Sequence, residues 1–278
     1  MKKISRRSFM AAAAVSVAAL ALTACGGSAS SAASSVASSA ASSEAASSAA
    51  AAELTTVEAG KLTMATNATF PPYEMTTDSG EIEGIDVDTA KAIAEKLGLE
   101  LQIDDMEFDA ALLSVQQGKA DIVMAGVTVT DERKAVMDFS DSYATGIQSI
   151  IVPNDSDIAS PDDLAGKKIG TQRGTTGYIY CSDDFGEDSV VAYDSGLTAV
   201  QALNNGQVDA VVIDNAPAQE FVAANPGLKV LDTSYAEEDY AIGMAKGSAL
   251  EDAVNKALEE LKADGTLQAI VDKYINAN

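Results

Sequence analysis

The sequence predicts an α/β protein whose globular part consists of two similar lobes with a cleft between them. From residue 54 onward, about 225 residues alternate short strand-forming runs with helical patterns, which is typical of parallel sheets covered by helices on both faces. One succession of residues occurs twice in this part of the chain, at 115–126 and at 203–214. The length allows two modest domains, so we expect two lobes of one design.

Residues 1–25 have the features of an export signal. The basic residues at its start are Lys2, Lys3, Arg6 and Arg7. The apolar run Met10–Leu22 has the length of a signal peptide and is too short to span a bilayer. It ends in Leu22-Thr23-Ala24-Cys25, which resembles the lipobox of bacterial lipoproteins and implies that Cys25 carries lipid and becomes the mature N-terminus. A cysteine that merely follows a signal peptide is the alternative, and the paired arginines also resemble a twin-arginine signal.

Residues 26–53 are almost wholly Ser, Ala and Gly, and Glu44 is their only charged residue before Glu53. A segment with so few large apolar side chains cannot offset the entropy of ordering, so we expect a disordered tether. Leader and tether together predict a protein outside the cytoplasm that is anchored to the cell membrane by lipid on Cys25. Cys181 is the only other thiol, and we expect it to be a small buried residue without a function.

The charge balance and the missing residue types exclude several classes of function. Past Ala24, 14 basic residues face 42 acidic ones, and such a surface repels nucleic acid, so we expect no nucleic-acid partner. The chain has no His, which excludes Ser-His-Asp and Cys-His catalysis as well as His-ligated zinc or haem. We expect no metal ion and no cofactor.

Local patterns predict the first elements of the globular part. The run Lys61–Thr66 predicts a strand that ends in a turn at residues 67–72. Asp88 fits the N-cap of a helix that Gly98 ends. The apolar residues at helical spacing in it are Ala90, Ile93, Ala94 and Leu97. The elements expected next are a strand at Leu99–Ile103, a helix from about Asp109 to Gln117, a strand at Asp121–Ala125 and a helix that opens near Thr130.

The repeated succession predicts a ligand site at the ends of strands. Both segments contain the end of a helix, a Gly, a short turn, an Asp and a buried strand. Connections between helices and strands can share this order by chance, which is the alternative to a repeat. On the repeat interpretation, Gly126 and Asp214 occupy matching positions at the carboxyl ends of two strands, where open α/β sheets bind ligands.

Four motifs resemble those of a known family. They are Asn67–Glu74, Gly84–Asp88, Ala125–Arg133 and Gly170–Thr176. In this order and spacing they resemble the polar amino acid-binding proteins of ABC importers, the extracellular solute-binding family 3, over essentially all of residues 57–275. The resemblance implies the type II periplasmic-binding-protein fold, with two lobes joined by two crossover strands near Gly146–Ile150 and Thr233–Tyr240.

The resemblance also implies the lobe boundaries and a function. Residues 54–148 and 238–278 would form lobe 1, and residues 149–237 would form lobe 2. The protein would capture a free amino acid between the lobes as a monomer and deliver it to the permease subunits of an ABC importer. It would not be an enzyme.

Arg133 is the expected clamp for the carboxylate of the ligand. Thr130 fits a helix N-cap, so Arg133 is the third helical residue, where its charge opposes the helix dipole. A guanidinium there can hold a carboxylate through two hydrogen bonds, whereas pairing with a neighbouring acid is the alternative. The resemblance implies that the amide and hydroxyl of Thr128 and the amide of Thr176 assist Arg133. Simple capping by Thr175 or Thr176 is the alternative at that helix start.

The other expected contacts come from the ends of strands and from two aromatic side chains. Asp214 can accept from an α-ammonium group, although such a residue also suits a turn. The resemblance implies a backbone contact from Gly126, which lacks the hydroxyl that some relatives carry here. Phe70 and Phe108 match two aromatic positions that sandwich the ligand side chain, with ordinary core packing as the alternative.

The nature of the ligand side chain is less well defined by the sequence. Asn67 matches a site that is Asp in several binders of basic amino acids, which favours a neutral polar ligand, and Gln172 could add a polar contact. One alternative function is an amino acid sensor or adhesin that uses the same closure. Another is an enzyme of the dehydratase type on this fold, for which Asp214 and Glu74 are the candidate acids.

Overall fold

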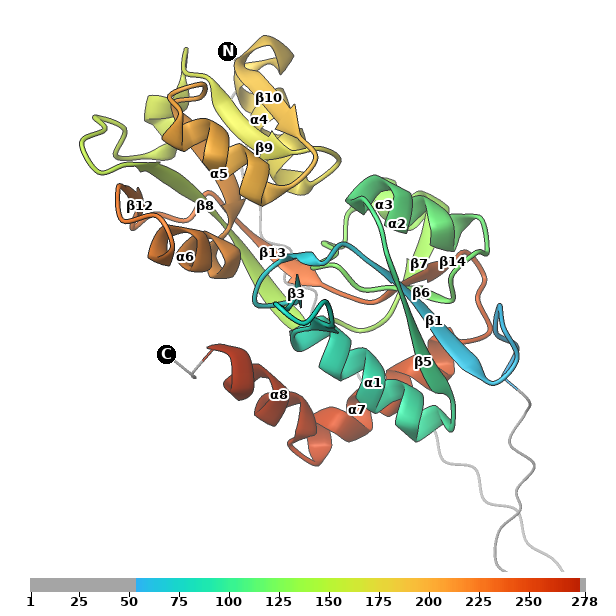
Figure 1. Cartoon of the computed structure of the whole chain (residues 1–278). Coiled ribbons are helices and arrows are strands. Elements are labelled where there is room, and N and C mark those ends of the chain that lie inside the picture. The colour runs from blue at the N-terminus through green and yellow to red at the C-terminus, as the bar shows by residue number, and fades with distance from the viewer. Residues whose placement is uncertain (1–53, 276–278) are drawn as a thin grey trace, which may run out of the picture. The chain divides into compact units, whose positions relative to one another are not determined.

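Two open sheets, one in each lobe, organise the part of the chain that this computed structural model describes, residues 54–275 (Figure 1). The predicted leader with Cys25 and the predicted tether at 26–53 lie outside the described residues, as do residues 276–278. No helix between residues 54 and 275 is long and apolar enough to cross a bilayer.

The sheet of the first lobe has the strand order β5-β1-β6-β14-β7. Its strands are β1 (Lys61–Thr66), β5 (Glu100–Asp105), β6 (Ile122–Val123), β7 (Met137–Phe139) and β14 (Gly243–Ala245). β1 runs parallel to β5 and β6, whereas β14 is antiparallel to both of its neighbours. A separate small sheet consists of β2 (Thr69–Phe70), β3 (Glu74–Thr76) and β4 (Ile82–Glu83).

Helices cover this first sheet. The described ones are α1 (Ile85–Leu97), α2 (Phe108–Gln116), α3 (Asp131–Val136), α7 (Glu251–Ala263) and α8 (Thr266–Ile275). α1 packs against β5, and α2 packs against β1, β6 and β14. α7 and α8 pack on α1 and on each other, which buries the apolar faces of all three helices.

The sheet of the second lobe has the order β10-β9-β11-β8-β12, with β13 also paired to β8. Its strands are β8 (Ala144–Pro153), β9 (Ile169–Gln172), β10 (Val190–Tyr193), β11 (Ala210–Asp214), β12 (Leu228–Val230) and β13 (Ala236–Tyr240). The helices are α4 (Thr176–Phe185), α5 (Gly196–Asn204) and α6 (Asn215–Ala223), with short 3₁₀ turns at Pro161–Leu164 and Glu187–Ser189.

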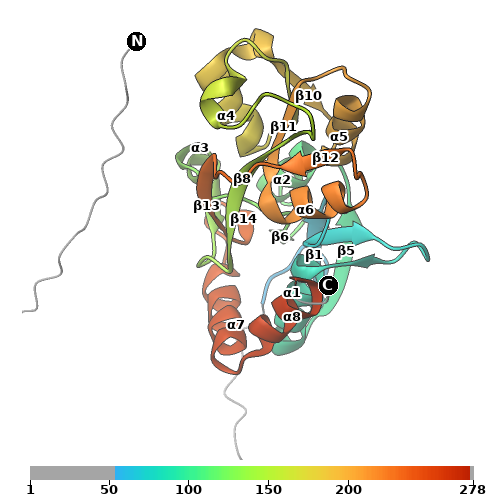
Figure 2. The same cartoon turned by 90° about the vertical axis from the view of Figure 1, so that its left-hand side faces the viewer.

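Two strands carry the chain between the lobes, as the predicted fold requires. β8 and β13 lie side by side and antiparallel, with Gln148 opposite Ala236 and Ala144 opposite Tyr240 (Figure 2). β8 contains the predicted crossover Gly146–Ile150, and β13 covers the last five residues of the one predicted at Thr233–Tyr240. The lobe boundaries predicted at 148/149 and 237/238 fall inside these strands and remain predictions.

Both sheets are mixed rather than parallel, which corrects the sequence-based expectation. β9, β10 and β11 are parallel, but β8 is antiparallel to β11, β12 and β13. A covering helix between two strands keeps them parallel. β8 instead enters the second sheet directly from the first lobe and runs opposite to β11, β12 and β13.

The predicted ends of helices and strands are confirmed where neighbouring residues alone determine them. β1 has the predicted bounds, and Gly98 ends α1 with φ 70°. The predicted N-cap of α1 is wrong, because the helix begins three residues before Asp88, after Gly84. The Asp88 carboxylate instead accepts hydrogen bonds from Lys273 (2.7 Å) and Tyr274 (2.9 Å) of α8. The strand expected at 121–125 is shortened to the two residues of β6.

The repeated succession corresponds to the same structure in both lobes. α2 and α5 are each followed by a glycine of positive φ, Gly118 (65°) and Gly206 (67°). Asp121 then accepts from the amides of Val57 and Thr63, and Asp209 accepts from the amide of Lys168. Each Asp therefore satisfies backbone N–H groups of a neighbouring segment before the buried strand starts.

Cys181 is fully buried in α4, within the apolar core of the second lobe. Burial raises the pKa of its thiol to about 12, so the side chain stays protonated at neutral pH. Its location agrees with the expected role as a small apolar residue.

Candidate functional site

A small cavity lies where the two lobes meet, lined by residues of both lobes. Its walls contain every residue that the sequence proposed for ligand binding: Asn67, Phe70, Phe108, Gly126, Thr128, Arg133, Gln172, Thr176 and Asp214. The remaining lining residues are Glu74, Ala125, Gln148, Thr175, Val212 and Ile213. The structure thus brings the predicted set together in one place, and the binding role of each residue remains a prediction.

Arg133 lies in this wall with only 8% of its surface exposed. The hydroxyl of Thr130 caps α3 by accepting from the Arg133 amide (3.1 Å), as predicted. The guanidinium donates from Nη1 to the carbonyl oxygen of Thr128 (2.7 Å) and from Nη2 to that of Gly174 (3.1 Å). It also lies over the ring of Phe108, 5.3 Å from the centroid. Neither hydrogen-bond partner is an acid, so the positive charge is free to meet an anion.

Burial lowers the pKa of Arg133, and the nearby Glu238 carboxylate opposes this shift. An arginine remains charged under such conditions because its ordinary pKa is far above neutrality. The cavity therefore holds a desolvated cation, which attracts a carboxylate more strongly than an exposed one does.

α4 begins at the same wall, on the second lobe. Thr175 is its N-cap and accepts from the amide of Tyr178 (3.4 Å). Thr176 is the first helical residue and is buried, with its Oγ1 3.5 Å from Oγ1 of Thr128. The amides of the first turn have no partner within a helix, so they can serve an anion between the lobes.

Asp214 ends β11 and is buried in the cavity wall. Its Oδ1 accepts from the hydroxyl of Tyr240, and its Oδ2 accepts from Nε2 of Gln148 (2.8 Å). The side chain makes no capping bond to α6, so it does not act as a simple turn residue. Burial raises the pKa of Asp214 to about 7, with the Tyr240 hydrogen bond opposing the rise and Glu238 adding to it.

Gly126 and the aromatic side chains shape the cavity. Gly126 has φ 55°, and a Cβ on it would lie 2.8 Å from the ring of Phe70, so only glycine fits. Phe70 and Phe108 line the cavity and also belong to the apolar cores. Their contact with a ligand side chain remains a prediction.

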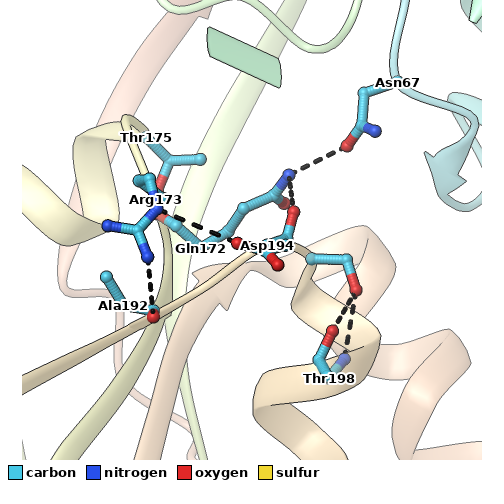
Figure 3. A network of polar contacts seen from close by, with 8 residues as sticks. Asn67, Gln172, Arg173, Thr175, Ala192, Asp194 and Thr198 are labelled. Carbon is cyan, nitrogen blue, oxygen red and sulfur yellow. Dashed lines mark hydrogen bonds and ion pairs between the residues drawn. The ribbon is translucent and has the colours of Figure 1, made fainter. Parts of the chain in front are cut away.

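Asn67 and Gln172 join the lobes at another part of the wall (Figure 3). Gln172 Nε2 donates to Asn67 Oδ1 (2.9 Å) and to the carbonyl oxygen of Asp194 (3.4 Å). Asn67 is held in turn by its bond to the carbonyl of Met106 (2.9 Å). This part of the wall is polar and carries no charge.

Comparison with known proteins decides the family. Residues 62–277 match the bacterial extracellular solute-binding proteins, family 3. The chain belongs to this family. It is 33% identical over 225 residues to the L-cystine-binding protein TcyJ of Escherichia coli (strain K12), covering 80% of this chain and 85% of that protein.

Solved structures of similar proteins agree. The arginine-, lysine-, histidine-binding protein ArtJ of Geobacillus stearothermophilus has a TM-score of 0.75 and 34% identity, covering 78% of this chain and 96% of that one. An ancestral arginine-binding protein bound to glutamine has a TM-score of 0.74 and 42% identity, covering 78% and 98%. The family resemblance and the two-lobed fold are therefore confirmed.

Sequence reasoning missed three residues of this family 3 site, all on the crossover strands. Gln148 of β8 lines the cavity. Glu238 and Tyr240 of β13 contact residues of the cavity wall, because Glu238 accepts from Thr128 and Tyr240 donates to Asp214. Glu238 and Tyr240 share the buried face of β13, where exposed Glu237 and Asp239 alternate with them. In a strand with this alternation of buried and exposed residues, Glu238 falls on the buried face. An acid at such a position is the sequence signal that could have revealed Glu238.

Glu74 also lines the cavity and is fully buried. Burial, together with the nearby Asp86 carboxylate, raises its pKa well above the usual range. Asp86 accepts from the amide of Gly126 (2.9 Å) and from the hydroxyl of Tyr143 (2.7 Å). Within residues 54–275, no three acids or thiols are placed to hold a metal ion.

Proposed function

We propose that this family 3 protein captures a polar amino acid in the cavity between its lobes and delivers it to the permease of an ABC importer. One observation carries the proposal: a buried guanidinium and a buried carboxylate, Arg133 and Asp214, line the same cavity. Every free amino acid carries the complementary α-carboxylate and α-ammonium groups. Arg133 with the first amides of α4 would hold the carboxylate, and Asp214 would accept from the ammonium.

The ligand side chain would lie between Phe70 and Phe108 and extend toward Asn67 and Gln172. The uncharged amides at that end favour a neutral polar side chain such as that of glutamine. Relatives that are named for a ligand or were solved with one support a polar amino acid in general. They include the E. coli protein named for L-cystine and two structures of ancestral arginine-binding proteins, one bound to glutamine and one bound to arginine.

A thermal-shift screen of the twenty L-amino acids tests this function. A ligand at 100 times its Kd adds about 2.7 kcal/mol to the free energy of unfolding, which raises Tm by about 5–10 °C in a domain of this size. We expect one or a few polar amino acids to produce such a shift. Arg133→Ala should remove the shift, and no shift with any amino acid would overturn the proposal.

We propose binding without catalysis at this site. Asp214, the better placed of the two candidate acids, already accepts two hydrogen bonds and would be occupied by the ammonium group. Burial holds Glu74 toward its protonated form, which has no free carboxylate to accept a proton as a general base. Incubation with the best binder of the screen should return it unchanged.

Attachment to the membrane belongs to the same proposal. The support is the lipobox-like sequence Leu22–Cys25 ahead of the Ser- and Ala-rich segment 26–53. The exported protein would be a monomer held at the membrane by lipid on Cys25. Cys25→Ser should release the protein or leave its leader uncleaved, and unchanged processing with unchanged membrane attachment would contradict the anchor.

A further inference from the structure

A second pocket lies on the other side of the crossover strands from the ligand cavity, and we call it the rear pocket. Figure 1 shows α6 and α8 on this side of β8 and β13, away from α2 and α3. Of the described residues, Asp214 alone lines both spaces. The walls of the rear pocket come from both lobes and from the crossover strands, and they include Tyr73, Tyr274, Gly146, Ile147, Ala216 and Gln219.

Aromatic and aliphatic side chains form much of the rear pocket. The rings of Tyr73 and Tyr240 meet edge to face in its wall, with centroids 5.3 Å apart, and Tyr274 of α8 adds a third ring. Ile147 of β8 and Ile275 of α8 also line it and are 39% and 45% exposed. Large apolar side chains that stay exposed and converge on one hollow indicate a place for an apolar group of a ligand.

The polar groups of the rear pocket favour a cation. Asp214 and Glu220 both line it, and none of its described lining residues is a lysine or an arginine. Asn215 and Gln219 add side-chain amides that can accept hydrogen bonds. The net charge of −24 attracts cations to the whole protein, and the tyrosine rings attract them at close range. A small aromatic compound with an ammonium group is therefore complementary to this pocket.

The width of the rear pocket depends on the arrangement of the lobes. Arg133 donates to the carbonyl of Gly174, and Gln172 donates to Asn67, so the lobes are closed over the ligand cavity. Because β8 and β13 carry the chain between the lobes, elements on their two sides move in opposite senses when the lobes rotate. Opening the ligand cavity therefore brings α6 toward the end of α8 and narrows the rear pocket.

We propose that the rear pocket is a second ligand site, which takes a small aromatic ammonium compound and holds the lobes closed when it is occupied. An occupant that fits only the wide form of the pocket favours the closed state and so strengthens binding of the amino acid. Linkage makes this effect reciprocal. The site itself does not depend on the proposed function, whereas its coupling to the amino acid rests on that function.

The experiment is calorimetry with 2-phenylethylamine as the probe and 3-phenylpropionate as an anion of the same shape. On the wild type without an amino acid, we expect the amine to bind and the anion not to bind. A saturating concentration of the amine should then lower the Kd of the best amino acid of the screen by about fivefold. An amine that entered the ligand cavity instead would compete with the amino acid and raise this Kd. The sign of the change therefore distinguishes the two places.

Ala216→Trp fills the rear pocket from the first turn of α6. It should abolish binding of the amine and, because it hinders opening, lower the Kd of the amino acid by about fivefold. Ala223→Trp is the matched control, since Ala223 is exposed at the last residue of the same helix and does not line the pocket. The control should bind both compounds as the wild type does.

Glu220→Gln supplies a test that does not require Ala216→Trp to fold. It should weaken binding of the amine by about two- to fivefold and leave the affinity for the amino acid unchanged. Glu187→Gln removes the same charge from an exposed position of the second lobe outside the pocket and should change neither affinity.

The possible results separate the site from its coupling. No binding of the amine to the wild type overturns the site, and so does equal binding of the amine in Ala216→Trp and Ala223→Trp or in Glu220→Gln and Glu187→Gln. A bound amine that leaves the Kd of the amino acid unchanged, or raises it, overturns the coupling. Wild-type protein that binds the amine but no amino acid supports the site and overturns the proposed function together with the coupling.

Discussion

Arg133 of α3 donates a hydrogen bond to the carbonyl oxygen of Gly174, 3.1 Å away, and so links the first lobe to the second. Gly174 precedes α4 with φ 74°, and a Cβ on it would overlap the carboxylate of Asp109 in α2. The lobes thus approach each other closely at a glycine. This contact makes the closed arrangement sensitive to a single methyl group.

Gly174→Ala should therefore favour an open arrangement of the lobes. Because a ligand that touches both lobes needs the closed state, its affinity should fall by about tenfold or more. Small-angle scattering with a saturating amino acid should give a larger radius of gyration for the variant than for the wild type. Gly247→Ala is the matched control, since Gly247 has the same φ of 74° with no atom near its Cβ position. The control should lose about 1 kcal/mol of stability and keep its affinity. Equal affinities in both variants would exclude this closure contact.

Arg133→Ala should lower the affinity for the amino acid by about two to four decades, because a desolvated carboxylate loses its charged partner. Calorimetry measures the loss, and the melting curve shows that the fold is retained. Arg173 is the control, because its side chain is 59% exposed and does not line the cavity. It donates to the carbonyl oxygen of Ala192 and forms an ion pair with Asp194. Arg173→Ala should bind normally. Near-native affinity in Arg133→Ala would place the ligand elsewhere.

Binding should weaken in acid through Asp214. Its pKa of about 7 in the ligand-free protein is raised mainly by burial and should fall when an ammonium group lies beside it. Below about pH 7, binding must therefore release a proton, and affinity should drop by up to tenfold per pH unit. Calorimetry in buffers of different ionisation enthalpy measures this proton release. Asp214→Asn should bind weakly and show no release, and a wild-type affinity that is constant from pH 5 to 8 would contradict the assignment.

The free energy of unfolding of the ligand-free protein should fall as the pH rises from about 4 to 7. Burial raises the pKa of Asp86 to about 6, that of Asp214 to about 7, and that of Glu74 well above its usual range. The pKa of these groups in the unfolded chain is near 4. Between about pH 4 and their pKa values in the folded protein, the folded protein therefore binds more protons than the unfolded chain. The stabilising contribution is complete below about pH 4 and is lost as the pH rises through 6 to 7.

Glu74→Gln tests this explanation, because an amide imitates the protonated acid at every pH. Thermal melts should show little difference between variant and wild type at pH 4.5 and a higher Tm of the variant at pH 8. The comparison removes the general repulsion of the net charge of −24, which both proteins share to within one charge. Parallel pH profiles of Tm would show that Glu74 does not titrate on unfolding.

The parts of the fold that the sequence predicted are those decided by nearby residues. Thr130 starts α3 through its side chain and Gly98 ends α1 through its backbone conformation, so their roles are local and were predictable. Asp88 also fits the local rule for an N-cap. Its carboxylate instead accepts hydrogen bonds from Lys273 and Tyr274 of α8, and no local sequence pattern reveals that contact.

The residues of the candidate site also fall into those that the sequence could predict and those that it could not. The motif residues could be predicted because each motif ends a strand or begins a helix. Glu238 and Gln148 lie in crossover strands without a motif, and they reach Thr128 and Asp214 only because β8 pairs with β13 and with β11. The direction of β8 also explains why the second sheet is mixed, since no covering helix sets it.

A crystal structure of the protein with the best amino acid of the screen tests the central claim most directly. The account predicts an amino acid enclosed between the lobes, with its carboxylate within hydrogen-bond distance of the Arg133 guanidinium and its ammonium on Asp214. An amino acid bound outside this cavity, or one enclosed in it with the two groups exchanged, would contradict the account.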